Sequence, residues 1–117
     1  EGARIPVSLD PKLKMDGQKI YGVTEIHSLE DASKNPITIN PAKGDVVETI
    51  LHEQLHAVDP MMDHEKVYKM AAHIEESMTL PQMAKVLLDT HDRAMNPVHR
   101  RVMTPTRAGN VISSHIK

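Results

Sequence analysis

The chain of 117 residues contains no cysteine, and this absence limits both its covalent chemistry and its metal chemistry. Disulfide bonds and thiolate ligands are excluded, so any bound metal ion has to be held by His, Asp or Glu side chains. A protein without cysteine also suits a reducing compartment. We therefore expect a cytoplasmic protein, with a signal segment removed before Glu1 as the alternative.

Large aromatic side chains are nearly missing as well, since there is no Phe, no Trp and only two Tyr. The interior is therefore expected to be filled by aliphatic residues and by flexible methionine, of which there are eight. The net charge of −2 argues against a general nucleic-acid-binding protein, because such proteins carry a large basic excess. No apolar run is long enough to span a membrane.

The first forty residues predict a short β-sheet, because apolar and β-branched residues alternate there between turn signals. The pair Asp16-Gly17 is one such turn signal. The predicted strands cover residues 4–9, 19–27 and 37–39.

After Pro41 the apolar residues recur at helical spacing. Asp45 is a capping residue at the start of this pattern, and Asp59-Pro60 ends it, because a residue that precedes proline disfavours the helical conformation. This predicts a helix over residues 45–58. Two further helices are predicted, from about Asp63 and over residues 81–95, and the order of strands before helices is typical of the α+β class.

The length favours a single domain. We expect that domain to cover residues 1–97 and to be followed by a basic, mostly irregular tail over residues 98–117. A short strand at Val111-Ile112 is the exception within the tail. Its basic residues are expected to be solvated rather than to form a phosphate-binding arm.

Residues 52–56 read His-Glu-Gln-Leu-His, an H-E-x-x-H motif on the predicted helix 45–58. Residues four apart lie on the same face of a helix, so His52 and His56 can reach one metal ion at about 2.0–2.1 Å. Glu53 is offset around the helix and can act on a water at that metal without being a ligand. Shuffling the composition yields the motif only about 0.04 times per chain, so coincidence is a poor explanation.

A catalytic zinc ion takes three protein ligands, so a third ligand has to be found. His64 is the first candidate, because Pro60 turns the chain and His64 opens a second helix that can pack back on the first. Other candidates stay open at this point: Glu65, His73, Glu76, and from the C-terminal part His91 or His99.

The stretch from Ile37 to Val58 resembles the core of zincin-type zinc metallopeptidases, and the helix itself is similar to that of small metallopeptidase-like proteins of phages and prophages. The resemblance implies that 37–39 is an edge strand above the cleft, where an extended peptide pairs with it. The Gly and third His that follow the motif in metzincins are absent here.

The resemblance also implies a function, namely a Zn²⁺-dependent hydrolase that cleaves peptide bonds with Glu53 as general base. A peptide or protein is then the substrate, and Tyr68 is a candidate donor to the oxyanion. The alternative is an inactive or regulatory zincin scaffold that binds a protein partner, with zinc in a structural role. A third reading is a metal-free helical interaction module.

Overall fold

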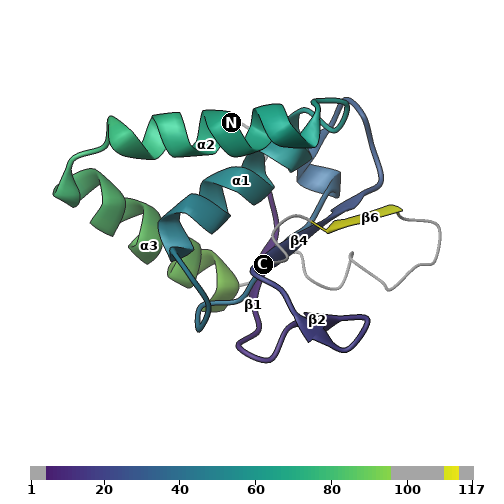
Figure 1. Cartoon of the computed structure of the whole chain (residues 1–117), viewed down its shortest axis with the longest axis horizontal. Helices are drawn as coiled ribbons and strands as arrows, with labels where there is room; N and C mark the ends of the chain where they lie inside the picture. The colour runs from purple at the N-terminus through teal and green to yellow at the C-terminus, as the bar shows by residue number, and fades with distance from the viewer. Residues whose placement is uncertain (1–4, 96–109, 114–117) are drawn as a thin grey trace.

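The computed structural model describes residues 5–95 and the backbone of residues 110–113. Three helices cover one side of a small mixed sheet, so the α+β class is confirmed (Figure 1). No helix among these residues is long and apolar enough to cross a membrane.

The main sheet has four short strands in the order β1-β5-β4-β6. β1 pairs in parallel with β5, whereas β4 is antiparallel to both of its neighbours, β5 and β6. The strands are β1 (Val7–Leu9), β4 (Gly22–Ile26), β5 (Ile37–Ile39) and β6 (Asn110–Ser113).

The expectation that strand 37–39 lies at the edge of the sheet is wrong. This strand is β5, and it is hydrogen-bonded to β1 on one side and to β4 on the other, so it offers no free edge to a peptide. The physical reason is burial: Ile37 and Ile39 both belong to the hydrophobic core, which a central strand can satisfy.

The predicted strand 19–27 is divided into two. A separate hairpin joins β2 (Lys14–Met15) to β3 (Gln18–Lys19), and its turn uses positive φ angles of 55° at Asp16 and 76° at Gly17. Asn-Gly and Asp-Gly pairs favour this geometry, because both central residues must adopt positive φ. After the buried Ile20 the chain enters the main sheet as β4.

The helices are α1 (Val46–Val58), α2 (His64–Glu76) and α3 (Leu80–Met95), close to the predicted positions. Asp45 caps α1 as expected, since its side chain accepts a hydrogen bond of 3.2 Å from the backbone N–H of Glu48. α1 lies between the sheet and α2, and α3 packs against β1 and α1 (Figure 1). The short 3-10 helix η1 (Ala32–Lys34) precedes β5.

The core is aliphatic, as the scarcity of aromatic residues requires. The expected contribution of methionine is wrong: among the described residues no methionine is fully buried, and Met61 and Met95 are exposed. Isoleucine and valine from the strands and from α1 fill the space instead, since β-branched side chains suit a pleated surface. The buried cluster consists of Val7, Ile37, Ile39, Ile50, Ala57 and Ala94.

Candidate metal centre

His52 and His56 occupy successive turns of α1 and are buried, with exposed fractions of 0% and 1%. Their Nε2 atoms lie 3.2 Å apart. In a tetrahedral zinc site with bonds of about 2.0–2.1 Å, two ligand nitrogens are about 3.3 Å apart. The two rings are therefore spaced as a shared cation requires, although an N–H···N hydrogen bond between them fits the same distance.

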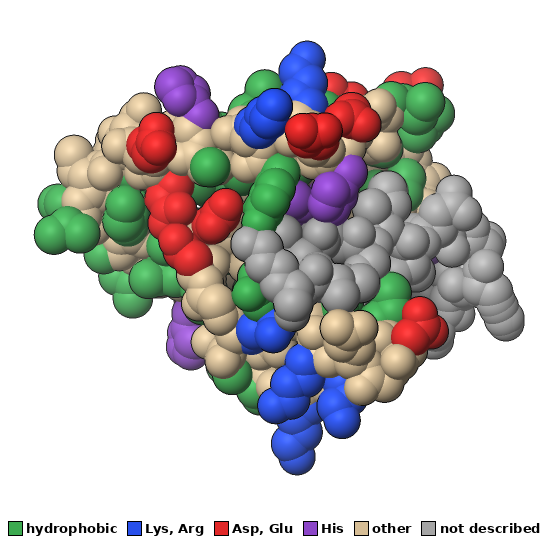
Figure 2. Space-filling view, in the orientation of Figure 1, with side chains coloured by type: hydrophobic (Ala, Val, Ile, Leu, Met, Phe, Trp, Pro, Cys, Tyr) green, Lys and Arg blue, Asp and Glu red, His purple; other side chains and the backbone are tan. Residues whose placement is uncertain are grey.

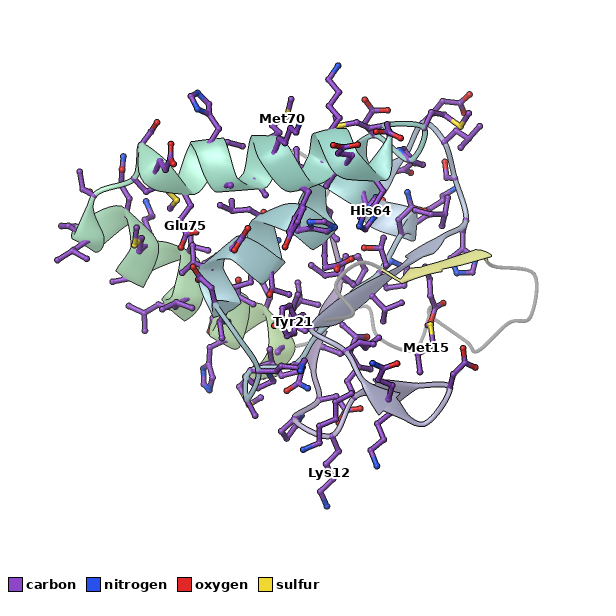
Figure 3. The ribbon with its side chains drawn as sticks, viewed as in Figure 1. Lys12, Met15, Tyr21, His64, Met70 and Glu75 are labelled. Carbon is purple, nitrogen blue, oxygen red and sulfur yellow. The ribbon has the colours of Figure 1, made fainter. Side chains whose placement is uncertain are left out.

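His64 is the third member of this group. It is the first residue of α2, and its imidazole lies 5.0 Å from the ring of His52 and 5.3 Å from that of His56, measured between centroids. One ligand atom from each of the three residues falls within 4.8 Å of the others. Figure 3 shows His64 on the side of α2 that faces α1. His64 is exposed, and a shared tetrahedral ion needs ligand nitrogens about 3.3 Å apart.

The turn after α1 explains why His64 reaches this position. Asp59 is the C-cap of α1, and the backbone N–H of Met62 donates a 3.0 Å hydrogen bond to the carbonyl of Asp59. This tight connection turns the chain within a few residues, so that α2 packs back along α1. The first turn of α2 therefore lies beside the last turn of α1, which carries His56.

The other candidate ligands are not part of this group. Glu65 is exposed and pairs with Lys69 at 3.6 Å. His73 and Glu76 are exposed further along α2, and His91 is exposed on α3. His99 lies outside the described residues.

Glu53 points to the sheet and is completely buried. The hydroxyl of Thr24, on β4, lies 2.5 Å from Glu53 Oε1 and 3.1 Å from its backbone oxygen. Gly22, two residues earlier on the same face of β4, makes room for this carboxylate: a Cβ atom there would lie 3.0 Å from Glu53 Cγ and 3.1 Å from Oε2. Apart from strand alternation, no pattern in the sequence indicated that Thr24 and Gly22 contact Glu53. Both lie about thirty positions away from Glu53 along the chain.

The electrostatics of the group favour neutral imidazole. Burial, followed by the charge of His64, lowers the pKa of His56 to about 4. At neutral pH His56 therefore offers a nitrogen lone pair, which is the form that binds metal ions. Within the described part of the chain, its buried Nδ1 has no hydrogen-bond partner.

Tyr68 lies next to the imidazoles, one turn after His64 on α2. Its ring centroid is 5.7 Å from that of His52 and 6.4 Å from that of His64. The side chain of Tyr68 is half-buried, so it can either pack against its neighbours or donate a hydrogen bond at the site.

A second group of acidic side chains lies at the other end of α1. Oxygens of Asp45, Glu48 and Glu75 fall within 4.8 Å of one another. A hydrogen bond with Asp45, together with burial and the charges of Asp45 and Glu48, raises the pKa of Glu75 to about 7. This group links the start of α1 to the end of α2.

Three imidazoles without a thiolate form a donor set that can hold a divalent metal ion. The geometry leaves the identity of the ion open, because imidazole binds several first-row metals. Comparisons of the chain with protein-family models, curated proteins and solved structures found no match.

Proposed function

We propose that this chain is a zinc-dependent peptidase in which His52, His56 and His64 hold the metal ion and Glu53 is the general base. One observation carries the proposal: two buried imidazole nitrogens of α1 lie 3.2 Å apart, a third histidine lies within 4.8 Å of them, and the buried Glu53 follows His52 on α1. Three histidines support the proposal because a catalytic zinc site uses three protein ligands and keeps one position open.

A zinc ion at this group would supply a Lewis acid that polarises a substrate carbonyl and lowers the pKa of a water ligand to about 7. The chain supplies the proton transfers. The carboxylate of Glu53 accepts a proton from the attacking water and returns it to the leaving amine. The hydrogen bond from Thr24 orients one oxygen of Glu53, and the phenol of Tyr68 stands where a donor to the developing oxyanion is useful.

The metal is tested by elemental analysis and by calorimetric titration of the full chain with Zn²⁺. We expect one zinc per chain, and we expect His52→Ala, His56→Ala and His64→Ala to weaken binding at least about tenfold each. His73→Ala is the matched control, because His73 is an exposed histidine on the same helix but outside the group. A wild-type chain that binds no zinc would refute the site.

The chemistry is tested with Glu53→Gln, which keeps the size and hydrogen-bonding capacity of the side chain but removes its basicity. The variant should retain zinc and fold while hydrolysis of a peptide library falls at least about 100-fold. Equal hydrolysis by the variant and the wild-type chain would exclude Glu53 as the base.

One observation favours a second function, a zinc-stabilised scaffold that binds a protein partner. His52, Glu53 and His56 are all buried, at 0%, 0% and 1% exposure, so none of the three side chains is accessible to a peptide substrate in this structure. In that case the zinc-loaded wild-type chain cleaves no peptide, and removal of zinc by a chelator lowers its melting temperature.

A further inference from the structure

α3 carries apolar residues on two faces, and the other residues that the structure describes cover only one of them. Towards the core, Val86 packs against the buried cluster, and Thr90 and Ala94 are buried. On the outer face Leu80, Leu87, Leu88 and Met95 are exposed by 79%, 41%, 71% and 56%. Figure 2 shows hydrophobic side chains gathering at the left of the molecule, where Figure 1 places the start of α3.

The outer residues form one continuous stripe. At 100° per residue, they fall within an arc of about 100° around the helix. The helix is about 24 Å long, so the stripe runs along its whole length. We call this set the α3 stripe, and its members are Leu80, Ala84, Leu87, Leu88, His91 and Met95.

The positions of the α3 stripe are spaced symmetrically around a point between Leu87 and Leu88. A two-fold axis through that point in an antiparallel pair of helices sets Leu87 against Leu88 of a second copy. The same axis sets Leu80 against Met95, and Ala84 against His91. Each contact between the two copies then includes at least one apolar or small side chain of the α3 stripe.

Charged residues that flank the α3 stripe support the same pairing. Lys85 and Asp92 are exposed on the same flank of the stripe, seven residues or two turns apart. The two-fold axis keeps this flank on the same side of both helices, so Lys85 of one copy lies within about 3 Å, along the helix axis, of Asp92 in the other. The pairing thus brings Lys85 of each copy close to Asp92 of the other, and symmetry makes two such pairs of opposite charge.

We propose that the α3 stripe is a self-association surface, through which two copies of this chain pair with their α3 helices antiparallel. Six residues a side is fewer than in a standard interface, so we expect a weak dimer with a Kd of roughly 10–100 µM. The proposal does not depend on the metal site, because none of His52, His56 and His64 is in the α3 stripe.

The first test is sedimentation velocity of the full chain over about 5–500 µM. We expect a concentration-dependent shift from monomer to dimer, and we expect Leu88→Glu to raise the Kd about tenfold or more. Leu29→Glu is the matched control, since Leu29 is exposed by 59% and lies outside the stripe. A monomer at every concentration, or a dimer that Leu88→Glu leaves intact, would overturn the proposal.

The second test fixes the orientation and uses the absence of cysteine from the chain. Leu88→Cys should form a disulfide-linked dimer under mild oxidation, because residue 88 lies about 1.5 Å along the axis from its symmetry mate. Leu80→Cys should not, because about 22 Å separates the two copies of residue 80 in the antiparallel pair. Efficient linkage through residue 80 and none through residue 88 would rule out this geometry.

The rim charges provide a third, independent measurement. Lys85→Asp and Asp92→Lys should each raise the dimer Kd about two- to tenfold at low salt, and the double variant should restore it. Failure of the double variant to recover affinity would contradict the predicted register.

Discussion

Replacing Gly22 by alanine adds one methyl group at a place where β4 lies against Glu53. The new Cβ would lie 3.0 Å from Glu53 Cγ and from Thr49 Cγ2, and 3.1 Å from Glu53 Oε2. The φ angle of Gly22 is outside the left-handed region, so the backbone accepts alanine and the cost arises from space alone. The substitution therefore tests how tightly the sheet holds the carboxylate.

Gly22→Ala has two opposite effects on the free energy of unfolding. Overpacking of a filled interior costs about 1–3 kcal/mol. Alanine also restricts the unfolded chain, which stabilises the protein by about 0.4–1 kcal/mol. The net expectation is a loss of about 0.5–2 kcal/mol in the free energy of unfolding. Glu53 should be displaced from Thr24, so under the proposed function hydrolysis should fall while zinc stays bound, because both α1 histidines are untouched.

Urea denaturation with a chelator present measures this cost without the contribution of the metal. A double-mutant cycle with Glu53→Ala isolates the contact, because that variant removes Cγ and Oε2, two of the three atoms nearest to the new Cβ. We expect a coupling of about 1 kcal/mol between the two sites. A gain of 0.4–1 kcal/mol from Gly22→Ala in the wild-type background would show that the carboxylate is not held as described.

Three further predictions concern stability. Because the pKa of Glu75 is raised to about 7, the free energy of unfolding should increase as pH falls from about 7 to 4.5. Glu75→Gln should stabilise the protein at pH 8 and abolish this pH-dependent increase, as measured by thermal melts. The pKa of His56 is lowered to about 4, so the metal-free protein should lose stability as pH falls from 6.5 to 4, and His56→Gln should flatten that fall. The buried amide of Asn35 donates to the carbonyls of Ser28 and Ala57 at 2.8 and 2.9 Å, so Asn35→Ala should cost about 2–4 kcal/mol by urea denaturation, whereas exposed Lys34→Ala should cost less than about 0.5 kcal/mol.

The part of the fold that the sequence predicted well is the part with local signals at both ends. α1 has a capping residue, Asp45, at its start and Asp59-Pro60 at its end, so its bounds and the shared face of His52 and His56 followed from spacing. His64 could be brought to the same group because the connection between α1 and α2 is short. Its part in metal binding remains a proposal.

The interactions that the sequence did not predict are non-local. Thr24 and Glu53 are 29 residues apart, and no local pattern tells which strand faces a given helix residue. The central position of β5 depends in the same way on β1, which joins it from the start of the chain. Composition also could not show that aliphatic residues would fill the core without methionine, because that depends on which faces meet.

The pairing of β4 with β6 has a consequence for the order of folding. About 80 residues separate the two strands along the chain. At ordinary rates of synthesis the ribosome therefore completes β4 roughly 4–16 s before β6, which pairs with its outer edge. During that interval α1 can already lie on the sheet, whereas the open strand edge is a template for other extended chains. Nascent chains that stop before residue 110 should therefore aggregate more readily than those that include β6.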